Sequence, residues 1–292
     1  MQRSPHELGR HFRHPGLDPG AACLFDPPRR RIPGQARDDG FHAMTALPTR
    51  KDEAFRYADI EALASVWREL ATPEIITIAA QQKVQQIWLP SDEDVQVRRV
   101  AMTLRTGASA SIFALNTASH YGRIEIDVSL HEGADFSLHA ANIGGGSSNL
   151  EIVTIVRHLE PSATSRQMVR SVLGGKAVGS YLGKVAVARD AQHSDSVQSI
   201  KAMLLNRGAA ANAKPELEIY ADDVKCAHGA TVGELDRDQL FYAAARGLDP
   251  AAARALLLDG FVGGLWDEAE GGEAIANQAR AALKALSAGV GA

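Results

Sequence analysis

The sequence predicts a mainly β protein, built around a parallel β-helix with helical regions before and after it. Between Glu74 and about Val232 the chain is a series of short alternating or apolar runs, such as RIEIDVSL and LEIVTIV, which is the period-two pattern of strands. No long helical pattern separates these runs, which argues against alternating strand–helix units. A β-sandwich is the alternative, but the Asn-Gly or Asp-Gly hairpin signals that it needs are scarce.

The segment 1–43 differs in composition from the rest of the chain. It holds six of the twelve prolines and seven arginines but no lysine, and it has almost no apolar periodicity. Such a composition cannot bury enough surface to offset the entropy of ordering the chain. Because Met44 stands where the globular pattern begins, we interpret 1–43 as a disordered extension that results from a mis-assigned start. A genuine disordered extension is the alternative.

The region 44–73 is predicted to be the N-terminal helical region. Residues 50–71 carry apolar side chains at the spacing of one helical face, namely Ile60, Leu63, Ala64, Trp67 and Leu70. Pro73 follows this pattern and is expected to end the helix.

Turn-like pairs of residues punctuate the predicted β-helix core, 74–232. These pairs begin at Gly107, Gly133, Ser162, Asp190, Gly208 and Gly229, at intervals of 26, 29, 28, 18 and 21 residues. The intervals are irregular but fall in the range of repeat arrays. Small residues at the corners are expected where each coil covers the next one.

The region 233–292 returns to a helical period and is predicted to bind partners. Asp236 is a predicted N-cap, and Gly247 is the predicted C-terminal stop of the same helix. Asp249 and Pro250 supply the N-cap and first position of a second helix. The segment GGEAIANQARAALKALSAG predicts a third helix.

Composition excludes several classes of function. The formal net charge of −4 and the pI near 6.2 provide no basic field for nucleic acid or an anionic membrane. No run approaches the ~20 apolar residues of a membrane span, and the first residues lack an apolar signal segment. Cys23 and Cys226 lie too far apart for a disulfide framework or a CxxC zinc site. We therefore expect a soluble, cytoplasmic protein with no nucleic-acid or membrane partner.

Motifs for nucleotide binding and hydrolysis are absent. The segment LGGKAVG lacks the Walker A spacing, so we expect no nucleotide to bind this chain. No GxSxG or HExxH pattern occurs. The GGGSS at 144–148 is interpreted as a turn, because no strand–helix junction follows it.

One stretch, PELEIYADDVKCAHGATVGELD from Pro215, combines residues that carry chemistry. Val224, Cys226 and His228 share one side of a strand by the period-two rule. A Cys and a His two residues apart can bind a soft metal, or present sulfur beside a proton acceptor. A buried thiol beside a hydrogen-bonded core histidine is the alternative interpretation, and the spacing leaves both open.

Three blocks of the sequence resemble the SufB/SufD family of the Suf iron–sulfur cluster assembly system, and its SufD branch in particular. PELEIYADDVKCAHGATVGELDRDQLFYAAARGLDPAAARALLLDGF is similar to the family's C-terminal signature. The family's N-terminal motif is similar to LPTRKDEAFRYADI at 47–60, with Phe55 where a tryptophan is usual. The family's Gln-containing coil is similar to HSDSVQSIKAMLL at 193–205. The SufB pattern has a His-Glu-Ala-Thr-type sequence where this chain has Cys-Ala-His-Gly-Ala-Thr, which favours SufD. The resemblance spans about 44–265, and relatives are often considerably longer.

This resemblance implies a right-handed parallel β-helix in a non-catalytic scaffold that supports iron acquisition and cluster assembly. The implied partners are a SufB-like chain, bound through the β-helix ends, and the SufC-type ABC ATPase, bound through the C-terminal helices. The family's interface histidine falls on His228 and its cysteine on Cys226, so a transient iron–sulfur cluster would be shared with the partner chain, with His228 as the metal ligand. The ATPase-docking segment falls on Leu240, Phe241, Tyr242, Arg246 and Phe261.

Two other classes of function remain as alternatives. A stand-alone β-helix enzyme that acts on carbohydrate, such as a polysaccharide lyase, would place carboxylates, arginines or a histidine in an external groove. Such lyases are usually exported, and this sequence shows no export signal. A passive structural member of an assembly would instead retain its function when His228 is changed.

Overall fold

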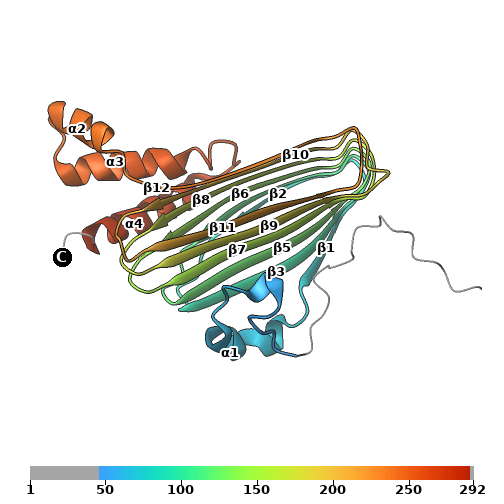
Figure 1. Cartoon of the computed structure of the whole chain (residues 1–292), viewed down its shortest axis with the longest axis horizontal. Coiled ribbons are helices and arrows are strands. Elements are labelled where there is room, and N and C mark those ends of the chain that lie inside the picture. Colours follow the sequence, from blue (N-terminus) through green and yellow to red (C-terminus); the bar gives the residue numbers. More distant parts are fainter. Residues whose placement is uncertain (1–45, 290–292) are drawn as a thin grey trace, which may run out of the picture. The chain divides into compact units, whose positions relative to one another are not determined.

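Twelve strands in two parallel sheets form the main body of the protein (Figure 1). The computed structural model describes residues 46–289, which belong to one structural unit. The strands are β1 (Glu74–Ile78), β2 (Lys83–Trp88), β3 (Val95–Leu104), β4 (Ser109–Asn116), β5 (Tyr121–Leu130), β6 (Asp135–Gly144), β7 (Asn149–His158), β8 (Thr164–Leu173), β9 (Val178–Val187), β10 (Asp195–Leu204), β11 (Ala210–Ile219) and β12 (Lys225–Glu234). The predicted extension 1–43, Met44 and Cys23 lie outside the described residues.

The order of the strands defines a solenoid. The odd-numbered strands pair in the order β1-β3-β5-β7-β9-β11, and the even-numbered strands in the order β12-β10-β8-β6-β4-β2. One odd and one even strand make a coil, so the chain advances by one parallel strand spacing in each sheet per coil. The prediction of a mainly β fold with a parallel β-helix between helical regions is confirmed.

One line of corners joins each odd strand to the even strand that follows it. Gly107 and Gly133 stand there with φ of 65° and 61°, in the left-handed region that glycine enters without steric cost. Their backbone N–H groups donate to Glu132 O at 2.8 Å and Pro161 O at 3.0 Å in the next coil. Ser162 repeats the same conformation with φ of 61°. These corners therefore connect successive coils by backbone hydrogen bonds.

Two of the predicted corner pairs do not belong to this line. Gly208 lies between β10 and β11, on the second line of corners, and Gly229 lies inside β12. The prediction of a turn at Gly229-Ala230 is therefore wrong, because that pair continues the pairing of β12 with β10. The predicted intervals of 18 and 21 residues are short because one runs between the two lines of corners, and the other runs from a corner to a position inside β12. Paired residues in neighbouring coils are 26 to 32 residues apart, as in Glu74–Val100 and Val178–Ala210.

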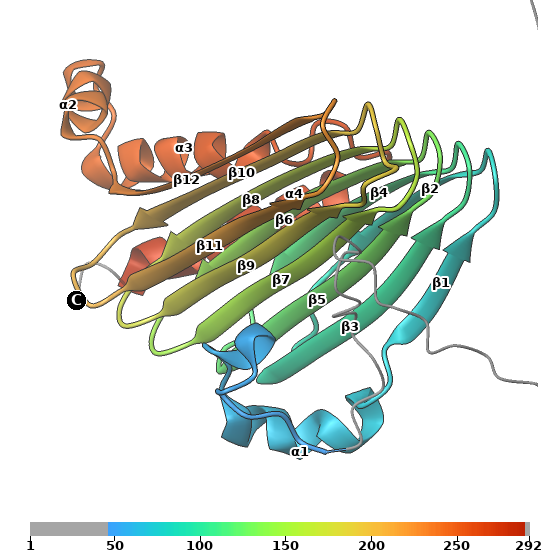
Figure 2. The same cartoon turned by 45° about the vertical axis from the view of Figure 1, so that its right-hand side comes forward.

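The N-terminal region packs against the outer face of the odd-numbered sheet (Figure 2). It consists of a 3-10 turn, η1 (Glu53–Phe55), and helix α1 (Ile60–Leu70). The predicted helix over 50–71 is too long, because the Asp59 side chain accepts a hydrogen bond from Ala62 N at 3.1 Å and caps a helix that begins at Ile60. Phe55 and Trp67 pack edge to face at 5.9 Å between ring centroids and anchor the region in a small apolar cluster.

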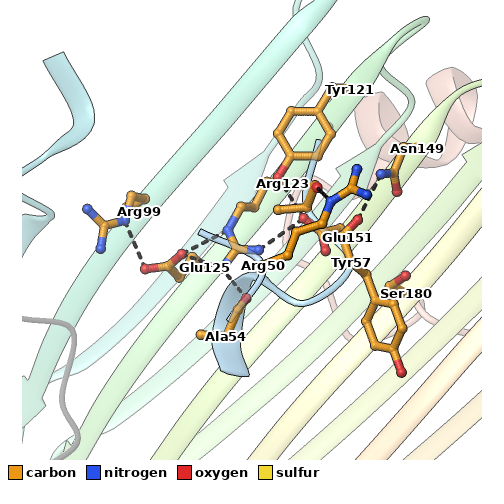
Figure 3. A network of polar contacts seen from close by, with 12 residues as sticks. Arg50, Ala54, Tyr57, Arg99, Tyr121, Arg123, Glu125, Asn149, Glu151 and Ser180 are labelled. Atoms are coloured by element: carbon orange, nitrogen blue, oxygen red, sulfur yellow. Dashed lines mark hydrogen bonds and ion pairs between the residues drawn. The ribbon is translucent and has the colours of Figure 1, made fainter. Parts of the chain in front are cut away.

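A buried network of charges holds this region in place (Figure 3). Arg123 is fully buried and contacts Glu125 at 2.7 Å and Glu151 at 3.0 Å, while its Nη2 donates to Ala54 O at 2.8 Å. Arg99 donates to Glu125 at 2.8 Å and to the carbonyl of Leu70, at the end of α1, at 2.6 Å. Burial alone would lower the pKa of Arg123, but the two carboxylates raise it, so the guanidinium stays charged. The network is structural and ties residues 54–70 to the sheet.

Three C-terminal helices follow β12: α2 (Arg237–Ala245), α3 (Pro250–Gly263) and α4 (Glu273–Gly289). The predicted caps are confirmed, since Asp236 accepts from Asp238 N at 2.8 Å and Asp249 accepts from Ala251 N at 2.9 Å. Helices α3 and α4 cover the outer face of the even-numbered sheet with a cluster of apolar residues. Between residues 46 and 289, no helix combines the length and the apolar character needed to cross a bilayer.

Candidate functional site at the open end of the solenoid

Strands β11 and β12 form the last coil and leave one end of the solenoid open (Figure 2). In the part of the chain that the structure describes, β12 pairs only with β10, and β11 only with β9. The outer edges of both strands therefore present unpaired backbone N–H and C=O groups, which is the arrangement that invites another strand. Val232, on β12, is 50% exposed.

Cys226 and His228 lie on β12 with their side chains on the inner side of the sheet. They pair with Ser196 and Gln198 of β10, which are fully buried inside the solenoid. Paired residues of parallel strands stack on the same face, so Cys226 and His228 continue two interior columns to the open end. Cys226 is half-buried and contacts the core, whereas His228 is exposed because no described coil covers it. The predicted placement on one side of a strand is confirmed.

The column beneath Cys226 is a chain of buried polar groups. His158 Nε2 lies 2.9 Å from Ser165 Oγ, and Ser165 Oγ donates to Ser196 Oγ at 2.9 Å. All three side chains are fully buried. Ser196 is the residue paired with Cys226, so hydroxyl groups connect a buried imidazole to the position next to the thiol.

The column beneath His228 is also polar. Gln198 Nε2 donates to Tyr181 Oη at 2.9 Å, and Tyr181 Oη donates to Gln167 Oε1 at 3.0 Å. Thr154 Oγ1 donates to the same Gln167 oxygen at 2.7 Å. Burial raises the pKa of Tyr181, so its hydroxyl stays protonated as a donor.

In these two columns, polar side chains are confined to the coils near the open end. One and two coils below Gln167, the same column holds Leu138 and Ile112. The column below Ser165 holds Phe136 and then Ala110. These four residues are fully or almost fully buried. In both columns the change from apolar to polar side chains therefore falls between β6 and β8.

The electrostatics of the open end keep the thiol protonated. Burial raises the pKa of Cys226, and the carboxylate of Asp195 raises it further. The free thiol is therefore a weak nucleophile, and a bound metal ion would have to displace its proton. Cys226 is a free cysteine in this structure.

The open end supplies too few ligands to hold a metal by itself. Nowhere in residues 46–289 do three or more His, Cys, Asp or Glu side chains converge in a geometry that could bind a metal ion. A [2Fe–2S] or [4Fe–4S] cluster is bound by four protein ligands, which are thiolates or, in some centres, imidazoles. Cys226 and His228 could contribute two ligands, and the remainder would have to come from outside the described residues.

Burial also has a consequence for stability in acid. The pKa of His158 is lowered to about 4 by burial, partly offset by the backbone of Ala163 and by Asp195. In the unfolded chain a histidine titrates near 6.5. Between these values the unfolded state binds a proton that the folded state does not, so the folded state is fully stabilised above about pH 6.5 and loses stability as the pH falls towards 4.

We therefore expect the variant His158→Gln, whose side chain still forms hydrogen bonds but does not titrate, to lose less stability in acid. The free energy of unfolding in urea, measured from pH 8 to pH 4.5, should fall more steeply for the unmodified chain, by up to about 3 kcal/mol. Above pH 7 the two chains should have the same slope, because histidine is neutral in both states there. Parallel curves over the whole range would contradict the buried, neutral state of His158.

The C-terminal helices separate the five predicted docking residues. Phe241 and Tyr242 lie on α2 with 76% and 61% of their surfaces exposed, and the Arg246 guanidinium stacks on the Tyr242 ring at 5.1 Å. Leu240 is partly buried. Phe261, on α3, is also partly buried and packs against the cluster that covers the even-numbered sheet.

Sequence reasoning missed Leu256 on α3. This side chain is 58% exposed and lies between two apolar grooves, of about 440 Å³ towards α2 and about 590 Å³ towards α4. Its neighbour Leu258 is buried. Consecutive residues of a helix are 100° apart, so the run Leu256–Leu258 cannot bury all of its side chains on one face. This run of three leucines is therefore the sequence signal from which an exposed apolar residue on this helix could have been predicted.

Comparison with known proteins places the chain in a family. A sequence model described as "SUF system FeS cluster assembly, SufBD core domain" matches residues 68–261. The chain therefore belongs to the SufBD family of the Suf iron–sulfur cluster assembly system. This is a family of assembly scaffold components rather than catalysts. The family assignment favours cluster assembly over the lyase alternative.

Several curated proteins are similar to part of this chain. The chain is 39% identical over 108 residues to an iron-sulfur cluster assembly SufBD family protein of Synechocystis, covering 37% of this chain and 24% of that protein. It is 36% identical over 108 residues to the iron-sulfur cluster assembly protein SufD of Escherichia coli, covering 37% and 26%. A SufBD family protein of Mycobacterium leprae is 26% identical over 197 residues, covering 64% and 50%. The chain thus spans between about a quarter and half of the length of these relatives.

Proposed function

We propose that this chain is a non-catalytic scaffold that contributes half of a shared site for iron–sulfur cluster assembly. The observation that carries the proposal is the position of Cys226 and His228, on the inner side of the terminal strand at the open end. The family assignment to Suf cluster assembly supplies the chemical context. The cluster is cargo in this proposal, held transiently and passed on.

The partner at the open end is a SufB-like chain. The unpaired edges of β11 and β12 favour a partner that adds strands there, because an exposed strand edge is otherwise a site of unspecific association. Such a partner would also cover His228 and supply the ligands that the described part of this chain lacks. A shared site explains why a metal-assembling family member has only two candidate ligands together.

The C-terminal helices are the proposed docking site for a SufC-type ABC ATPase. Phe241 and Tyr242 form an exposed aromatic pair on α2, and aromatic residues dominate the energy of protein interfaces. Leu256 and the two apolar grooves beside it extend this surface along α3. The chain itself has no Walker A sequence, so the ATPase would supply nucleotide hydrolysis.

Co-purification tests this function. The full chain is co-expressed with a SufB-like chain and a SufC-like ATPase from one Suf operon, with an affinity tag on this chain only. We expect all three proteins to elute together in gel filtration. Lys225 N–H donates to Ser194 O at 2.9 Å, so the odd-numbered residues of β12 face β10 and the even-numbered residues face the open edge. A variant with Ala230→Pro and Val232→Pro, which removes two N–H groups from that open edge, should retain the ATPase and lose the SufB-like chain. Elution of a monodisperse monomer with neither partner would contradict the proposal.

A further inference from the structure

Gln198 is held by its neighbours in one orientation. Its Nε2 donates to Tyr181 Oη, and that hydroxyl in turn donates to Gln167 Oε1. Gln167 Oε1 also accepts from Thr154 Oγ1, so this oxygen receives two donors, while Gln167 Nε2 is buried without a hydrogen bond within the described residues. The Gln198 amide nitrogen therefore faces the inside of the solenoid, towards β9.

The other end of the same amide has no partner. Gln198 Oε1 is completely buried and forms no hydrogen bond within the described residues. A buried carbonyl oxygen without a donor is destabilising, and native structures retain few of them. An apolar side chain would fill this position without that cost, as Leu138 and Ile112 do in the same column two and three coils away.

The neighbour of Gln198 on the side of the open end is His228. The two residues are paired in the register of β10 and β12, and both side chains lie on the inner side of the sheet. His228 carries ring nitrogens that can each donate or accept a hydrogen bond, depending on the tautomer. His228 is therefore the residue paired with Gln198 whose ring N–H could donate a hydrogen bond to the buried Gln198 Oε1.

We propose that Gln198 is a positioning residue for His228. Its Oε1 accepts the hydrogen bond of one ring N–H when a partner covers the open end, which fixes the tautomer and directs the lone pair of the second ring nitrogen towards the shared site. Histidines that bind metals commonly donate their other N–H to such an acceptor, which orients the ring and increases its basicity. This inference rests on the proposed role of His228 as a ligand.

Three variants in the assembled complex test the inference. Gln198→Met removes the acceptor and keeps the size of the side chain. Tyr181→Phe leaves Gln198 in place but removes the hydroxyl that holds its amide, and so covers the case in which Gln198→Met does not fold. Ser171→Ala is the matched control, because it removes a buried hydroxyl group from the interior of β8, in the column that ends at Val232 and not at Cys226 or His228.

Two measurements are made on the complex prepared without oxygen: affinity for Fe²⁺, and the tautomer of His228. The tautomer is read by solid-state NMR with ¹⁵N-histidine in this chain only, and the His228 signal is assigned by its loss in His228→Ala. We expect one tautomer in the unmodified complex and in Ser171→Ala. Gln198→Met should give a mixture and about tenfold weaker Fe²⁺ binding, and Tyr181→Phe a smaller change in the same direction.

The outcomes separate this inference from the proposed function. If His228→Ala loses Fe²⁺ binding while Gln198→Met and Tyr181→Phe keep both the single tautomer and the affinity, Gln198 does not position His228 and the scaffold function stands. If His228→Ala binds Fe²⁺ normally, the proposed site itself is wrong. An equal loss in Ser171→Ala would show a general effect of interior packing and would also overturn the inference.

Discussion

Replacement of His228 by alanine is expected to leave the complex assembled but almost without iron and sulfide. His228 is exposed at the end of the solenoid, so its removal should cost little folding free energy. Loss of a metal ligand should weaken iron binding at least as much as loss of an outer hydrogen-bond partner, by roughly 100-fold. The measurement is iron and acid-labile sulfide per complex after purification without oxygen.

Two controls accompany this variant. His193→Ala removes another exposed histidine, at a corner of the solenoid, and should load normally. Cys226→Ser should lower the iron content less than His228→Ala, because burial keeps this thiol protonated and no second cysteine lies near it in the sequence. Normal loading of His228→Ala would favour the passive structural role that the sequence left open.

Replacement of Phe241 by alanine is expected to weaken binding of the ABC ATPase by about 2 kcal/mol or more, which is roughly 30-fold in Kd. The ring is 76% exposed on α2, so it contributes little to the fold and has much surface to bury in a complex. Calorimetric titration of the ATPase into the co-purified pair of scaffold chains gives the affinity directly.

The matched control for Phe241→Ala is Ile75→Ala on β1, at the opposite end of the solenoid. Ile75 is a large apolar side chain that is 69% exposed. It belongs to the odd-numbered sheet, whereas α3 and α4 cover the even-numbered sheet, so ATPase binding should not change. Leu256→Ala should weaken binding in the same direction as Phe241→Ala, because both residues belong to the proposed docking surface. Unchanged affinity in both helix variants, with intact folds, removes this docking site.

Most of the fold could be predicted because its local signals agree with its tertiary structure. The alternating runs became strands, and the caps at Asp236 and Asp249 fixed where two helices begin. Errors arose where one local signal had two structural meanings. Gly229-Ala230 resembles a corner in composition but lies in β12, where strand pairing decides. The segment 50–58 has helical composition, yet the helix begins after the Asp59 cap.

The candidate site was only partly accessible from the sequence. Alternation placed Cys226 and His228 on one side of a strand, and the structure agrees. Alternation does not tell which side is the interior, nor which residues of earlier coils stack beneath them. The contacts between Gln167, Tyr181 and Gln198 join strands whose register differs from coil to coil. The roles of Cys226 and His228, and of the docking residues on α2 and α3, stay predictions.

The most direct test of the shared site is the iron and sulfide content of three samples prepared in parallel without oxygen: this chain alone, the SufB-like chain alone, and the complex of both with the ATPase. Our account predicts that this chain alone binds no cluster, and that the complex holds more iron and sulfide than its parts, in a manner that depends on His228. A complex that binds no more than the SufB-like chain alone, with or without His228, would contradict the account.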